Sequence, residues 1–291
     1  MSAFDKIIGY DHIKAELMQI SDMIHHPEVY AALDAKLPQG LLLSGAPGLG
    51  KTLMATALME DSGLPCFTVR RSQAEDDFLK QLAHTFDEAA EAAPSMLLLD
   101  DMDKFSSDEF STAAFTAVQS CIDKVQEKQV FVIATVNNVK ELPDSLLRCG
   151  RFDRQIEVQR PNCTDGEQII RRYLSGKAPV PDISLSDLTQ LLSHSSCAQV
   201  ESALNEAAIY AAYERSGSIT RVHLIHAVLK TIHHVPPEVY PVSEEQRKKA
   251  AFHEAGHAAM LELAEALLEK QTLLHSKIQA ICGRYRDVPA A

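Results

Sequence analysis

The sequence carries its clearest chemical pattern in one segment of eight residues that contains three glycines, a lysine and a threonine. The segment matches GxxxxGK(S/T) and directly follows a short apolar run. Glycines let backbone N–H groups turn toward phosphate oxygens, Lys51 would reach the β- and γ-phosphates, and Thr52 would ligate Mg²⁺. The alternative is a glycine-rich turn of an α/β fold. The candidate residues are Gly45, Ala46, Pro47, Gly48, Leu49, Gly50, Lys51 and Thr52.

Two acids and an amide stand at the ends of later apolar runs. Asp100 and Asp101 close the run that begins at Met96, and Asn137 follows the run at 130–136. Asp100 would hold Mg²⁺ through water, and Asp101 would orient or deprotonate the attacking water. Asn137 would contact the γ-phosphate or align that water. The alternative for the acids is a pair of solvated carboxylates at a strand end.

A group of three arginines lies between the last of these runs and the next. Arg148, Arg151 and Arg154 fall within seven residues. Such a group is compatible with a solvated patch, with internal salt bridges, or with arginine fingers that reach the nucleotide of a neighbouring subunit.

A second motif, HExxH, spans His253 to His257. On a helix it places two imidazoles one turn apart on one face, where they suit Zn²⁺, with Glu254 polarising a bound water. A catalytic zinc site needs a third protein ligand. His275, Asp287, Glu262 and Glu265 follow the motif. The two glutamates lie on the same expected helix and fit poorly, whereas His275 is conceivable after a turn. We expect His253, Glu254 and His257 to be remnants of such a site. A weak two-histidine metal site and an intact zinc site are the alternatives.

Short apolar runs alternate with amphipathic helical patterns through the first half of the chain. We expect strands at 40–45, 66–70, 96–100, 130–136 and 154–159, each buried on both faces of a mostly parallel sheet with helices on both sides. Phe78, Leu82 and Phe86 share a helical spacing that favours the core. From residue 161 the pattern is helical. The expected domains are an α/β domain at 1–160, a helical domain at 161–234, a linker at 235–242 and a short helical segment at 243–291.

The composition excludes several classes of function. The chain has 291 residues and a formal net charge of −12, which disfavours binding to nucleic acid or anionic membranes. No apolar stretch is long enough for a membrane-spanning helix, and the first residues lack a signal-peptide pattern. Six scattered cysteines without a CxxC pair fit reduced thiols. We therefore expect a cytoplasmic protein without a membrane segment.

In this order the motifs resemble those of AAA+ ATPases, and more narrowly those of the FtsH-type AAA metalloproteases. The resemblance implies a P-loop AAA+ core with a helical lid, ATP and Mg²⁺ as cofactors, and a ring that is a homohexamer. Ile8 and Gly9 would flank the adenine and Asn137 would be the first sensor. Arg151 and Arg154 would be arginine fingers that act on the neighbouring subunit, where such fingers are worth about 10³ to 10⁵ in rate.

The sequence departs from the family in its catalytic acid, its pore loop and its peptidase part. Asp101 stands where the family has Glu, and residues 70–78 lack the aromatic–apolar–glycine motif. Few residues follow His257, so we expect the body of the peptidase domain to be missing. We expect ATP hydrolysis in a ring without working proteolysis, acting on a protein client. The alternatives are an ATP-dependent zinc metalloendopeptidase and a nucleotide-dependent interaction module with little hydrolysis.

Overall fold

The computed structural model describes residues 2–35, 38–71, 75–105, 111–148, 150–175 and 184–234. The expected linker at 235–242 and the helical segment at 243–291 lie outside these ranges. His253, Glu254, His257 and His275 therefore lie outside the described residues as well. None of the described helices combines the length and the apolar character that a bilayer crossing requires.

Five parallel strands form the sheet in the first part of the chain. They are β1 (Gly40–Ser44), β2 (Cys66–Val69), β3 (Ser95–Leu99), β4 (Val130–Val136) and β5 (Arg154–Glu157), in the spatial order β2-β3-β4-β1-β5. The expected parallel sheet is therefore confirmed. In a parallel sheet the carboxyl ends of all strands lie along one edge, which brings residues distant in sequence together.

The expectation that every strand is buried on both faces is wrong for the two outer strands. In β2 only Val69 is buried, while Cys66 and Thr68 are exposed. In β5 only Ile156 is buried. Each of these strands has one neighbour in the sheet, so less of its surface is covered. The three inner strands, which have neighbours on both sides, are buried almost throughout.

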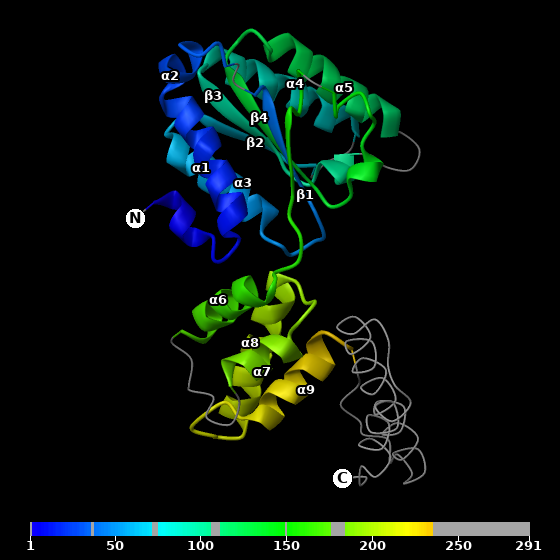
Figure 1. The fold of residues 1–291 in the computed structure, drawn as a ribbon. Helices are drawn as coiled ribbons and strands as arrows, with labels where there is room; N and C mark the ends of the chain where they lie inside the picture. Colours follow the sequence, from blue (N-terminus) through cyan, green and yellow to red (C-terminus); the bar gives the residue numbers. More distant parts are fainter. Residues whose placement is uncertain are drawn as a thin grey trace, which may run out of the picture. The chain divides into compact units, whose positions relative to one another are not determined.

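Helices cover both faces of the sheet, as expected (Figure 1). Leu41 and Leu43 belong to the cluster formed with α1 (Asp11–His25) and α3 (Lys51–Ser62). Leu42, on the opposite face of the same strand, packs with α4 (Glu75–Glu91) and α5 (Ser111–Val125). The alternation follows from the two-residue period of a strand. Shorter elements are η1 (Ala3–Lys6), α2 (Pro27–Ala31), η2 (Met102–Phe105) and η3 (Val139–Glu141).

The one aromatic residue in the sequence of the altered pore-loop segment, Phe78, belongs to the core. Phe78 is fully buried in α4, and its ring meets that of Phe105 edge-on at a centroid distance of 4.8 Å. Leu82 and Phe86 are buried on the same face of α4. The helical spacing therefore predicted the role of Phe78 correctly. Residues 72–74 of the same segment lie outside the described residues.

Four helices follow the sheet: α6 (Cys163–Leu174), α7 (Leu185–Leu191), α8 (Cys197–Tyr213) and α9 (Arg221–Thr231). The apolar stripe of α8 is buried at Val200, Leu204 and Ala211. Ser196 caps the helix, since its side chain accepts a hydrogen bond from the N–H of Gln199 while the Gln199 side chain accepts one from the N–H of Ser196. The capping box defines the start of α8, and this end of the helix lines the candidate site.

Candidate functional site

The phosphate-loop segment lies between β1 and α3, where the motif requires it to lie. Gly45 has φ +142°, and a Cβ there would lie 2.2 Å from the carbonyl oxygen of Val158. Only glycine fits this position, so the loop can turn sharply at the end of the strand. Gly50 precedes the first residue of α3, which is Lys51. The N–H groups at the start of α3 therefore adjoin the loop, as an anion site requires.

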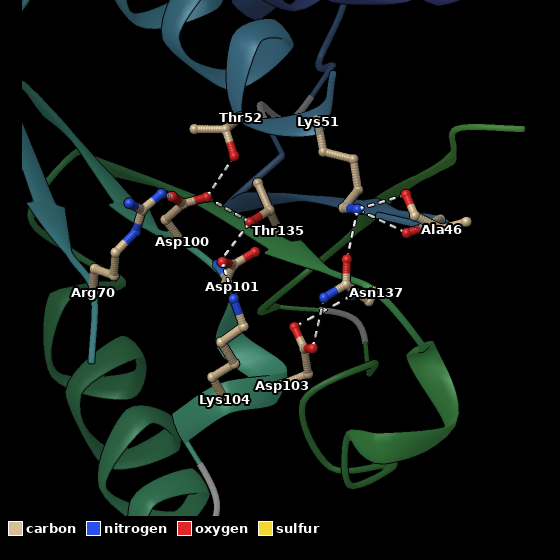
Figure 2. Close-up of polar contacts among 11 residues, drawn as sticks. Ala46, Lys51, Thr52, Arg70, Asp100, Asp101, Asp103, Lys104, Thr135 and Asn137 are labelled. Carbon is tan, nitrogen blue, oxygen red and sulfur yellow. Dashed lines mark hydrogen bonds and ion pairs between the residues drawn. The ribbon is translucent and has the colours of Figure 1, made fainter. Parts of the chain in front are cut away.

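Lys51 is held inside the loop by three acceptors. Its Nζ donates to the carbonyl oxygens of Gly45 (2.7 Å) and Ala46 (3.0 Å) and to Oδ1 of Asn137 (2.9 Å) (Figure 2). The residue is only 6% exposed. Burial lowers the pKa of Lys51, while nearby carboxylates, with that of Asp101 first, oppose the shift. A buried ammonium held only by neutral oxygens is ready to exchange them for phosphate oxygens.

Asp100 lies at the end of β3 with both carboxylate oxygens engaged. Its Oδ1 accepts hydrogen bonds from Thr52 and Thr135, each at 2.8 Å, and its Oδ2 accepts one from Arg70. Burial raises the pKa of Asp100, but the hydrogen bonds from Thr135, Thr52 and Arg70 outweigh it, so the pKa lies below its usual value. The carboxylate is therefore ionised beside the Thr52 hydroxyl, and this pair of oxygens suits Mg²⁺.

Asp101 and Asn137 lie on either side of the polar network. Asp101 has φ +54°; its N–H donates to Oγ1 of Thr135 (2.8 Å) and its carboxylate accepts from Lys104 (2.6 Å). Asn137 follows β4, and its Nδ2 donates to Asp103 (2.8 Å) while its Oδ1 accepts from Lys51. Because the backbone of Asp101 is left-handed, the side chains of Asp100 and Asp101 point in different directions. Asp100 thus faces Thr52 while Asp101 reaches Lys104 (Figure 2).

A cavity of about 370 Å³ adjoins the loop. Apolar side chains from the segment after η1, from the phosphate loop and from α3, α6 and α8 dominate its wall, as expected for a flat aromatic ligand. The main lining residues are Ile8, Leu49, Met54, Ile169, Tyr173 and Ala198. Two hydrogen bonds tie the helical part of the wall to the α/β part: the N–H of Ala198 donates to the carbonyl oxygen of Gly48 (3.1 Å), and that of Tyr10 donates to Asp165 (2.7 Å).

The residues predicted for the nucleotide site thus largely converge. Ile8 lines the cavity, whereas Gly9 is buried beside Asp165 and helps to set the turn before Tyr10. Gly48 and Gly50 line the cavity too. Ala46 contributes a carbonyl oxygen to Lys51, and Pro47 is exposed.

The two predicted finger arginines lie away from the chain's own phosphate loop. Arg154 pairs with Leu41 on the neighbouring strand β1. At 3.3 Å per residue, Leu41 lies about 13 Å along β1 from the start of the loop. Arg151 donates from Nε and Nη2 to the two carboxylate oxygens of Asp123, at 2.8 and 2.9 Å, and from Nη1 to the carbonyl oxygen of Ser145. Of the three interpretations weighed for these arginines, an internal salt bridge describes Arg151 in the single chain.

Three residues of the network were not predicted from the sequence as site residues. Thr135 is a fully buried hydroxyl near the carboxyl end of the apolar strand β4, which is a detectable signal. Asp103 is the third acid in four residues and holds Asn137. Arg70 directly follows β2, the strand beside β3, and only the strand order places it on Asp100.

Residues 41–160 match the family described as "ATPase family associated with various cellular activities (AAA)". Similar curated proteins named ATP-dependent zinc metalloprotease FtsH come from Ureaplasma parvum (32% identity over 266 residues) and Mycoplasma pneumoniae (32% over 269), and one named FtsH 1 comes from Thermomicrobium roseum (33% over 269). The chain carries an AAA+ domain of the FtsH type. The FtsH matches cover 88% of this chain but only 37%, 38% and 41% of those relatives, in the order named.

This AAA+ domain fits ATP·Mg²⁺ by its donors and its shape. The start of α3 provides a buried ammonium and a hydroxyl, the end of β3 provides a carboxylate 2.8 Å from that hydroxyl, and the cavity beside them is apolar. The fit of zinc is not described by the structure, since the HExxH motif lies outside the described residues. Within the described ranges, no group of three or more His, Cys, Asp or Glu side chains is arranged to hold a metal ion.

Proposed function

We propose that the chain binds ATP with Mg²⁺ and hydrolyses it. The observation that carries the proposal is the continuous network from Lys51 through Asn137 to Asp103, next to Thr52 and Asp100, at one edge of the sheet. Lys51 would leave its carbonyl partners to hold the β- and γ-phosphates, and Thr52 and Asp100 would hold the metal. Bound Mg²⁺ would neutralise charge that develops on the phosphates.

In this proposal the other residues position the attacking water. Asp101 would orient or deprotonate it, and Asn137, held by Asp103, would report on the γ-phosphate. The hydroxyl of Thr135 bonds to both the backbone N–H of Asp101 and the carboxylate of Asp100, and so fixes their positions relative to each other. Steady-state ATP turnover with and without Mg²⁺ tests the proposal, and turnover no faster in the presence of the chain than without it would contradict it.

We propose further that the chain works as a cytoplasmic hexameric ring that moves a protein client. The position of Arg151 and Arg154, far from the loop of the same chain, supports their action on a neighbour. Arg151 would have to exchange Asp123 for the phosphate of the adjacent subunit. Ring assembly and nucleotide binding would then both favour the release of Arg151 from Asp123.

We expect Arg151→Ala to lower turnover about 10³-fold while the dissociation constant for ATP stays within twofold, because a finger stabilises charge only in the transition state. Arg148→Ala is the matched control, since Arg148 is an exposed arginine of the same segment. The decisive measurement is the ATP turnover of rings that mix two inactive variants. Lys51→Ala subunits retain the arginine finger, and Arg151→Ala subunits retain an intact phosphate loop. Mixing them therefore restores turnover if the finger acts on the neighbouring subunit. No recovery in stable mixed rings would contradict this role.

Zinc-dependent proteolysis is the second candidate function, favoured by the HEAGH motif and by the names of the relatives. Our proposal leaves it out, because HExxH contributes two ligands and a catalytic zinc takes three from the protein. We expect less than about a tenth of an equivalent of zinc in the purified chain, with no change in His253→Ala. A full equivalent that His253→Ala removes would reinstate the protease. The third candidate, a nucleotide-gated interaction module, is favoured by Asp101 and would show ATP binding with little turnover.

A further inference from the structure

The acid proposed to face Mg²⁺ already has a cationic partner from the neighbouring strand. Arg70 directly follows β2, and the N–H of Asp100 donates to the carbonyl oxygen of Val69 (2.9 Å), which sets the two strand ends side by side. From there Nη2 of Arg70 donates to Oδ2 of Asp100 (Figure 2). The Asp100 side chain is 2% exposed and that of Arg70 is 60% exposed. The guanidinium therefore covers a buried carboxylate from the solvent side.

The ion pair between Arg70 and Asp100 adjoins the candidate Mg²⁺ site. Oδ1 of Asp100 accepts from Thr52, the hydroxyl proposed to ligate Mg²⁺, so one carboxylate joins the candidate metal ligand to the arginine. A guanidinium and a divalent ion that share one carboxylate repel each other, and each reduces the negative charge available to the other. Arg70 is always protonated, so its effect is permanent.

We propose that Arg70 is a built-in competitor of Mg²⁺ at Asp100, so that the nucleotide site fills with metal only at raised Mg²⁺ concentration. The inference rests on the proposed function, because it assumes that the site binds nucleotide. Arg70 is a positioning residue here. It neutralises the carboxylate of Asp100 when the metal is absent, and it weakens the binding of the metal when the metal is present. The neighbouring arginine does not share this role, since Nη1 of Arg71 donates to the carbonyl oxygen of Phe105 (2.7 Å).

The test is a Mg²⁺ titration of the full chain saturated with a fluorescent ATP analogue in EDTA, with the analogue's emission as the readout. Arg70→Gln removes the charge but keeps an N–H donor for Asp100, and Arg70→Lys keeps the charge. We expect Arg70→Gln to lower the Mg²⁺ concentration at half-saturation about tenfold, because one unit charge beside the metal is removed. Arg70→Lys and the matched control Arg71→Gln should follow the wild type.

Coincident curves for wild type and Arg70→Gln would overturn the inference, and so would a higher Mg²⁺ requirement in Arg70→Gln. If Arg70→Gln fails to fold, as its thermal unfolding would show, Arg70→Ala and Arg70→Lys provide the same comparison of neutral with charged side chains. Failure of the proposed function would look different, because no variant, including the wild type, would then bind the analogue at any Mg²⁺ concentration.

Discussion

Replacing Lys51 by Ala should abolish ATP turnover and most ATP binding. The ammonium is buried, touches only neutral oxygens, and is the one cation that the loop encloses within the described residues. Loss of one preorganised charge donor of this kind costs about 10²- to 10³-fold in rate. Steady-state turnover of the purified variant, measured against wild type, gives the effect directly.

A thermal-shift measurement separates this effect from misfolding. ATP·Mg²⁺ at about 100 times its dissociation constant should stabilise the wild type by about 2.7 kcal/mol, and it should leave Lys51→Ala unchanged. Lys128→Ala is a suitable control, because Lys128 is exposed in the turn before β4. Retention of more than half of the wild-type turnover by Lys51→Ala would exclude the loop as the catalytic site.

Replacing Asp101 by Glu should raise turnover up to about 10²-fold. The Asp101 carboxylate now bonds to Lys104 at 2.6 Å, and the side chain is one methylene shorter than the Glu of the family. A misplacement of about 1 Å in a catalytic group can cost about 10²-fold. The dissociation constant for ATP should not change, because Thr52 and Asp100 hold the metal through other atoms. Single-turnover hydrolysis and equilibrium binding measure the two quantities separately.

Asp101→Asn provides the matched comparison, since it keeps the shape of the side chain and removes its charge. We expect its turnover to fall to the level of Lys51→Ala while ATP still binds. If Asp101→Glu and Asp101→Asn both match the wild type, then Asp101 takes no part in catalysis. The chain would in that case act as a nucleotide-gated binding module.

The local elements of this protein were predictable, because each has a pattern that short-range physics explains. A strand followed by GxxxxGKT and a helix predicted the loop, and helical spacing placed Phe78 in the core. Patterns of residue type do not reveal which strand lies at an edge. The exposure of β2 and β5 was therefore missed, although both strands were predicted close to their actual bounds.

By itself the sequence determined which groups can do chemistry here: Lys51, Thr52, Asp100, Asp101 and Asn137 are recognisable from their place after apolar runs. Only the tertiary structure decided their partners. The order β2-β3-β4-β1-β5 brings Arg70 to Asp100 and Thr135 to both acids, and the register of β5 against β1 keeps Arg154 away from its own loop. Strand order is a property of the whole packed sheet, since it depends on how every helix covers its faces, and no local spacing encodes it.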